Sequence, residues 1–116
     1  MRNRYCSRIN QLSLCLLCLV ALLSSPGWAG STGDPANGKA VFSKATCTAC
    51  HYNGGNSLNP SKPIKGDAFT KKYPDDKSLE NVIRTGVKGT SMQAFGKEKV
   101  TDAEMKDLIA YIRSLK

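Results

Sequence analysis

The stretch Cys47-Thr48-Ala49-Cys50-His51 decides how the rest of this 116-residue chain must fold. Residues three and four apart lie on one face of a helix, so a single helical turn points both thiols and the imidazole to the same side. The Cys-x-x-Cys-His pattern is the signature of covalent c-type haem attachment. It predicts one haem c, bonded through Cys47 and Cys50, with His51 as an iron ligand.

Two other kinds of site use a Cys-x-x-Cys pair. A structural zinc site needs four Cys or His ligands, and from residue 30 onward the chain has only Cys47, Cys50 and His51. A thioredoxin-like redox centre needs a βαβ setting, which the pattern around residue 47 does not supply. Both alternatives are therefore disfavoured.

Residues 1–29 have the three parts of a secretory signal peptide. Three arginines without an acidic residue open the segment, an apolar run covers residues 12–23, and small residues precede a predicted cut before Gly30. We therefore expect a signal peptide over 1–29 and one monohaem domain over 30–116. The predicted location is the periplasm, or the thylakoid lumen if the host is photosynthetic.

Two kinds of anchor compete with a cleaved signal. An uncleaved membrane span needs about 20 apolar residues, more than the run over 12–23 provides. A lipoprotein anchor at Cys15 or Cys18 is disfavoured, because leucine precedes each of them where lipoprotein signals have a small residue. We do not expect an integral membrane protein.

Charge and cysteine content fit this division. The chain has 17 basic and 9 acidic residues, and loss of the three signal arginines leaves 14 against 9, a net charge of +5. No arginine-rich stripe with interleaved aromatic residues points to nucleic acid. Because Cys6, Cys15 and Cys18 leave with the signal, no thiol remains for a structural disulfide. A covalent haem would complete the small core of such a short domain.

Periodicity predicts an all-α domain with three main helices and a short one. The main helices are expected over residues 35–46 and 78–85 and from Thr101 onward, and the short one over 67–72. Thr101 and Glu104 form a capping box at the start of the last helix. Glycine inside a helix costs about 1 kcal/mol relative to alanine, so Gly38 predicts that another helix crosses there. Tyr111 is the expected aromatic partner of Phe42.

The second axial ligand of the iron decides the chemistry, because iron with one protein ligand can bind gases or peroxide, whereas iron with two mainly passes electrons. His51 is the only histidine, so methionine or lysine must supply this ligand. Met105 falls on the apolar stripe of the last helix, which favours a core position. Met92 lies in a loop between glycines and has no periodic reason to be buried. We expect Met92 to ligate the iron, with Lys88 or another loop lysine as the alternative.

Five stretches in the same order resemble class I c-type cytochromes, and most closely the small bacterial and photosynthetic members. They are Gly38-Lys39-Ala40-Val41-Phe42, Cys47-Thr48-Ala49-Cys50-His51, Pro63-Ile64-Lys65-Gly66, Met92-Gln93-Ala94-Phe95-Gly96 and Ala110-Tyr111-Ile112.

The resemblance implies the all-helical cytochrome c fold around the haem. It assigns Met92 as the distal ligand, the carbonyl of Pro63 as acceptor for the Nδ1–H of His51, and Ile64 as an apolar haem contact. Phe95, in the same stretch as Met92, is a further candidate for haem binding. Gln93 stands where many relatives have proline, which predicts a looser loop.

The expected function is that of a soluble, exported carrier of one electron between redox partners, without catalytic residues and not an enzyme. A group of lysines either forms a solvated face or a docking rim for acidic partner proteins; it comprises Lys62, Lys65, Lys71, Lys72 and Lys77. We expect a monomer. Two alternatives stay open: a small haem enzyme or ligand sensor with an open sixth iron site, and an electron-entry module that works only inside a larger complex.

Overall fold

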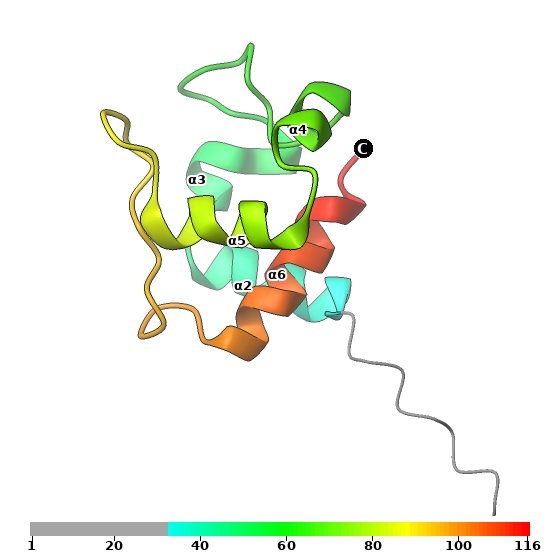
Figure 1. Cartoon of the computed structure of the whole chain (residues 1–116), viewed down its shortest axis with the longest axis vertical. Coiled ribbons are helices and arrows are strands. Elements are labelled where there is room, and N and C mark those ends of the chain that lie inside the picture. Colours follow the sequence, from blue (N-terminus) through cyan, green and yellow to red (C-terminus); the bar gives the residue numbers. More distant parts are fainter. Residues whose placement is uncertain (1–32) are drawn as a thin grey trace, which may run out of the picture. The chain divides into compact units, whose positions relative to one another are not determined.

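The computed structural model describes residues 33–116, so the predicted signal peptide over 1–29 lies outside the described residues. Within this part the chain forms helices and no strand, which confirms the all-α prediction. In chain order (Figure 1) the elements are α2 (Pro35–Lys44), α3 (Thr48–His51), the 3-10 turn η1 (Tyr52–Gly54), α4 (Asp67–Lys72), α5 (Asp76–Thr85) and α6 (Asp102–Ser114). No helix in residues 33–116 is long and apolar enough to cross a membrane.

The helix boundaries follow local signals. Helix α4 covers the predicted residues, whereas α5 begins two residues earlier than expected, because Asp75 caps it by accepting a hydrogen bond from the backbone of Ser78 at 2.7 Å. Helix α2 ends at Lys44, two residues before the predicted end. Thr46 adopts a left-handed φ of 60°, which a continuing right-handed helix cannot contain.

Helices α2 and α6 cross in contact at Gly38, as predicted (Figure 1). A Cβ atom at residue 38 would overlap the carbonyl oxygen of Asp107 and lie 2.7 Å from the Cβ of Tyr111. One turn further along α2, the rings of Phe42 and Tyr111 meet edge to face with their centroids 5.3 Å apart. Glycine at position 38 therefore permits a close approach between the two helices.

Polar contacts hold both ends of this crossing. Asp107 accepts a hydrogen bond from the backbone N–H of Asp34, the residue that caps α2, at 2.7 Å. Near the other end of α2, the Nζ of Lys44 lies 2.7 Å from the carboxylate of Glu104. Glu104 also completes the predicted capping box with Thr101.

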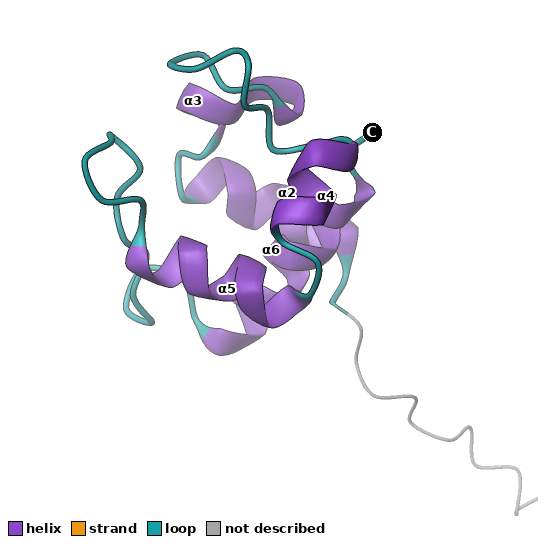
Figure 2. Ribbon diagram, turned by 45° about the horizontal axis from the view of Figure 1, so that its top comes forward, coloured by secondary structure: helices purple, strands orange, loops and turns teal. Residues whose placement is uncertain are grey.

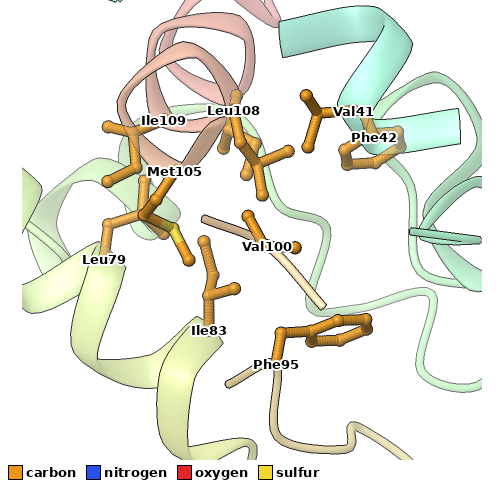
Figure 3. Packing of buried hydrophobic residues seen from close by; sticks show 10 residues of the cluster. Val41, Phe42, Leu79, Ile83, Phe95, Val100, Met105, Leu108 and Ile109 are labelled. Atoms are coloured by element: carbon orange, nitrogen blue, oxygen red, sulfur yellow. The ribbon is translucent and has the colours of Figure 1, made fainter. Parts of the chain in front are cut away.

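The apolar core lies among α2, α5 and α6 and includes two residues of the segment before α6. Figure 3 shows Leu79 and Ile83 of α5 beside Met105 of α6, with Phe95 at one end of the cluster. Met105 is 1% exposed, which confirms its predicted place in the core. The buried set is Val41, Phe42, Leu79, Ile83, Phe95, Val100, Met105, Leu108, Ile109 and Ile112.

Glu104 makes the α2–α6 contact sensitive to acid. The hydrogen bond from Lys44, and those from the backbone and hydroxyl of Thr101, lower the pKa of the Glu104 carboxyl from 4.5 to about 2. Because the folded-state pKa is the lower one, the native state binds fewer protons than the unfolded chain between these two values. The stability that Glu104 contributes is therefore complete above its ordinary pKa and is lost as the pH falls toward 2.

We predict that Glu104→Gln lowers the free energy of unfolding at pH 7. The gap in this free energy between the variant and the unmutated protein should disappear as the pH falls from about 5 to about 2. Glutamine can still serve the capping box but carries no charge for Lys44. Urea unfolding of the haem-loaded protein at a series of pH values measures this. Asp67→Asn is the control, because Asp67 is exposed and makes no ion pair within residues 33–116. A difference for Glu104→Gln that stays constant with pH would contradict the prediction.

Candidate haem-binding site

The Cys-x-x-Cys-His turn is joined directly to the helix crossing. The backbone N–H of Cys47 donates to the carbonyl of Phe42 at 3.0 Å, and the N–H of His51 donates to the carbonyl of Cys47 at 2.8 Å. Thr46, in its left-handed conformation, turns the chain from α2 into α3. Because Phe42 is fixed against α6, these bonds fix where the first cysteine begins the turn.

The two cysteines and the histidine line one cavity of about 740 Å³. Every other residue predicted to bind the cofactor lines the same cavity, namely Pro63, Ile64, Met92 and Phe95. Phe95 is buried, while Ile64 and Met92 are half-buried and pack against the core. The structure thus brings all seven candidate residues to one place.

This cavity suits a haem. Its volume lies within the range of about 300–1,000 Å³ that is usual for ligand and cofactor sites. Apolar side chains from α5 and α6 form much of its wall, including Leu79, Val82, Ile83, Leu108 and Ile112. Both cysteines are free, and His51 and Met92 line the same space. This is the donor set that a covalently attached, two-ligand haem requires.

The imidazole of His51 is held by a backbone carbonyl. Its Nδ1 lies 2.9 Å from the carbonyl oxygen of Gly55. Because a carbonyl oxygen can only accept, Nδ1 carries the proton and Nε2 keeps the lone pair for a metal. The resemblance assigned this acceptor to Pro63, and the structure corrects it to Gly55.

The turn after α3 explains the correction. Asn53 and Gly54 both have left-handed backbone conformations, with φ of 49° and 74°, so the chain reverses directly after His51. This reversal returns the carbonyl of Gly55 to the ring. Pro63 stays at the cavity wall, and the N–H of Ile64 donates to the carbonyl of Gly54 at 2.9 Å.

Burial raises the pKa of the Cys47 thiol above its ordinary value. The neighbouring Cys50 adds to this effect, while a backbone hydrogen bond opposes it. The thiol of Cys47 therefore stays protonated at neutral pH. Since the thiolate is the form that attacks a disulfide or an oxidant, burial lowers the reactivity of Cys47 in these reactions.

Met92 belongs to the segment between α5 and α6, a long loop that leaves the C-terminal end of α5 (Figure 2). The backbone N–H of Val87 donates to the carbonyl of Met92 at 3.0 Å, and the N–H of Met92 donates to the hydroxyl of Thr90 at 3.1 Å. Gly86, with φ of 69°, ends α5; a Cβ there would lie 2.6 Å from the Met92 carbonyl oxygen. The loop is therefore ordered by its own backbone.

The structure separates Met92 from the other candidate axial ligands. Met105 is buried in the core and is absent from the cavity wall, and Lys88 is exposed and does not line the cavity. Met92 therefore lines the cavity together with His51, whereas Met105 and Lys88 do not; Lys62, a lysine of the loop before α4, also lines it.

Among the cavity residues not predicted from the sequence are two aromatic ones. Phe69 of α4 and Tyr73, which follows α4, line the cavity with their ring centroids 5.2 Å apart. These two aromatic residues are four positions apart, at the predicted short helix, and such pairs share a helix face. This spacing could have predicted that both rings lie on the same side.

An all-helical fold around a cavity lined by two cysteines, a histidine and a methionine defines a protein with covalent haem. A family model described as cytochrome C oxidase, cbb3-type, subunit III matches residues 33–112. Cytochrome c6 of Picosynechococcus sp. is 36% identical over 107 residues, which cover 87% of each chain. Cytochrome c6 of Synechocystis sp. is 31% identical over 101 residues, 85% of this chain and 82% of its own.

A solved structure agrees with these sequence matches. The structure of cytochrome c6 from the diatom Phaeodactylum tricornutum superimposes with a TM-score of 0.58 at 30% identity, over 69% of this chain and 91% of its own. The chain belongs to the class I c-type cytochromes. It is an electron-transfer protein with one haem c, attached through Cys47 and Cys50.

Proposed function

We propose that this chain is an exported carrier that passes one electron at a time between protein partners, on a haem ligated by His51 and Met92. One observation carries the proposal: Met92 lines the same cavity as His51 and the two attachment cysteines. When bound, the haem supplies the ferric/ferrous couple. The residues of the chain hold it, orient its ligands and keep water away from it.

Each of these residues has a defined task. Cys47 and Cys50 provide the sulfurs of the two thioether bonds. His51, with Nδ1 bonded to Gly55, presents Nε2 at a fixed orientation, and such a bond also raises the basicity of a ligating imidazole. Met92 supplies a second ligand from an ordered loop. The apolar wall excludes water, which limits the solvent rearrangement that accompanies a change of charge.

The enzyme or sensor alternative requires an open iron site. With His51 and Met92 both bound, no position is left for oxygen or peroxide. His51 is also the only histidine in the chain, so no second imidazole can act as a distal acid or base. These features support a carrier without catalytic residues.

We predict that ferric, haem-loaded protein shows the weak sulfur-to-iron band in the far red and that Met92→Ala abolishes it and lowers the reduction potential. Met105→Leu is the control, because this near-isosteric core change leaves the axial ligands intact and costs less than about 1.5 kcal/mol. A band that survives Met92→Ala would refute Met92 as the ligand. A band missing from the unmutated protein, together with rapid binding of carbon monoxide after reduction, would support the open-site alternative.

Basic and apolar side chains surround the cavity and suit docking to acidic partners. Lys62 and Lys72 line the cavity, and no acidic side chain of residues 33–116 does. Neither lysine takes part in an ion pair in the described part of the chain. Leu58 and Val87, 67% and 39% exposed, line the same cavity and offer apolar contact. Such a surface favours brief encounters of a monomer with a negatively charged protein.

We predict that a Lys62→Glu/Lys72→Glu variant, in its reduced form, is oxidised by the hexacyanoferrate(III) anion about tenfold more slowly at low ionic strength. The difference should shrink as salt shortens the Debye length from about 30 Å at 0.01 M to about 8 Å at 0.15 M. Stopped-flow kinetics measures both effects. Lys39→Glu/Lys106→Glu is the control, since it changes the net charge equally at exposed sites outside the cavity. Equal slowing by the two variants, or rates independent of salt, would exclude a local lysine rim.

Export to the periplasm or the thylakoid lumen is part of the proposal and rests on the signal-like residues 1–29. Covalent haem attachment needs reduced thiols and haem in the same compartment, and the three cysteines of the signal would be removed before that step. We predict that the mass of the exported protein corresponds to residues 30–116 plus one haem. A mass that retains the first 29 residues would refute the cleavage.

A further inference from the structure

Arg84, in the last turn of α5, places its guanidinium group against the loop between α5 and α6. Its side chain is 15% exposed. Nη1 donates to the backbone carbonyls of Phe95, at 3.3 Å, and of Val100. Nε and Nη2 donate to the carboxylates of Glu80 and Asp102, at 3.4 and 3.0 Å. One planar cation thus joins α5, two points of the loop and the start of α6.

We call residues 86–100, the segment that contains Met92, the Met92 loop. Two of the acceptors of Arg84, the carbonyls of Phe95 and Val100, belong to this loop. The peptide groups of Phe95 are bound on both sides, because its N–H donates to the carbonyl of Ile83 at 3.0 Å and its carbonyl accepts from Arg84. Phe95 is three residues beyond Met92 and lines the same cavity. Its anchoring limits how far Met92 can move.

A lysine at position 84 could not make this set of contacts. The guanidinium group offers five N–H donors in a rigid plane, whereas an ammonium group is a compact charge on a flexible stem. Bonds from a charged donor are also stronger than neutral ones, and the carbonyls of Phe95 and Val100 belong to buried residues. The planar donor geometry and the buried acceptors together explain why this set of contacts needs arginine.

We propose that Arg84 is a positioning residue that holds the Met92 loop closed and thereby keeps the thioether at the iron. This deepens the proposed function and rests on Met92 as an axial ligand. Arg84 touches neither the cavity nor the attachment turn; it acts through the carbonyls of Phe95 and Val100.

Arg113 offers a matched comparison in the same molecule. Its Nη1 donates to the carbonyl of Tyr73 at 2.7 Å, its Nε donates to Asp76 at 3.2 Å, and its side chain is 25% exposed. It therefore joins a helix to a loop carbonyl and a carboxylate, as Arg84 does. Its acceptors lie outside the Met92 loop, although Tyr73 also lines the cavity.

The test compares haem-loaded unmutated protein with Arg84→Gln and Arg113→Gln. Hydrogen–deuterium exchange reports the opening of residues 86–100, and titration of the ferric protein with imidazole reports how readily the sixth iron position is vacated. For Arg84→Gln we expect loop exchange to be faster and imidazole binding to be tighter by about tenfold or more, the factor for one lost charge-assisted hydrogen bond. Arg113→Gln should change neither quantity by more than about twofold.

Equal changes in the two variants would overturn the proposal. So would faster loop exchange in Arg84→Gln with unchanged imidazole affinity, because the loop would then not govern the ligand. If Arg84→Gln fails to retain haem, the test uses Arg84→Lys in its place. Loop exchange and imidazole affinity should then exceed those of the unmutated protein, by less than the changes expected for Arg84→Gln. Absence of the far-red band from the unmutated protein refutes Met92 ligation separately, and loop exchange, which needs no axial ligand, still decides whether Arg84 holds the loop.

Discussion

The contact between the backbones of α2 and α6 at Gly38 is the constraint on which the rest of the structure depends. Because no side chain separates the helices there, Phe42 reaches Tyr111 one turn later, and its carbonyl then receives the N–H of Cys47. The crossing thus determines where the haem-attachment turn begins. A side chain at position 38 would move that turn relative to the cavity wall that α6 provides.

The core and the cofactor site share their side chains. Six of the buried core residues also line the cavity: Phe42, Leu79, Ile83, Phe95, Leu108 and Ile112. In a domain this short the apolar area buried by the chain alone is modest. Contacts that hold the haem therefore also stabilise the fold, and cofactor attachment and folding are thermodynamically linked.

The sequence predicted most of what depends on neighbouring residues. Periodicity and the Thr101–Glu104 capping box located α6, and the absence of periodicity around Met92 marked it as a ligand candidate, which the structure places in the cavity. The acceptor for His51 was assigned incorrectly, because it depends on the left-handed turn at Asn53 and Gly54. The contacts of Arg84 could not be predicted, since its loop and α6 acceptors lie 11 to 18 residues away and only the folded chain brings them together.

The distribution of ion pairs has an electrical consequence. Acidic side chains gather where α6 begins and are paired there with Lys44, Arg84 and Lys97, whereas the cavity wall contains lysines and no acid among the described residues. In Figure 1 the start of α6 and the segment from α3 to α4 lie at opposite ends of the described fold. Lys62 and Lys72 therefore give the cavity wall a positive charge that no acidic side chain of that wall offsets. Such a wall attracts a negatively charged molecule before the two surfaces touch, which raises the rate of encounter at this face of the chain.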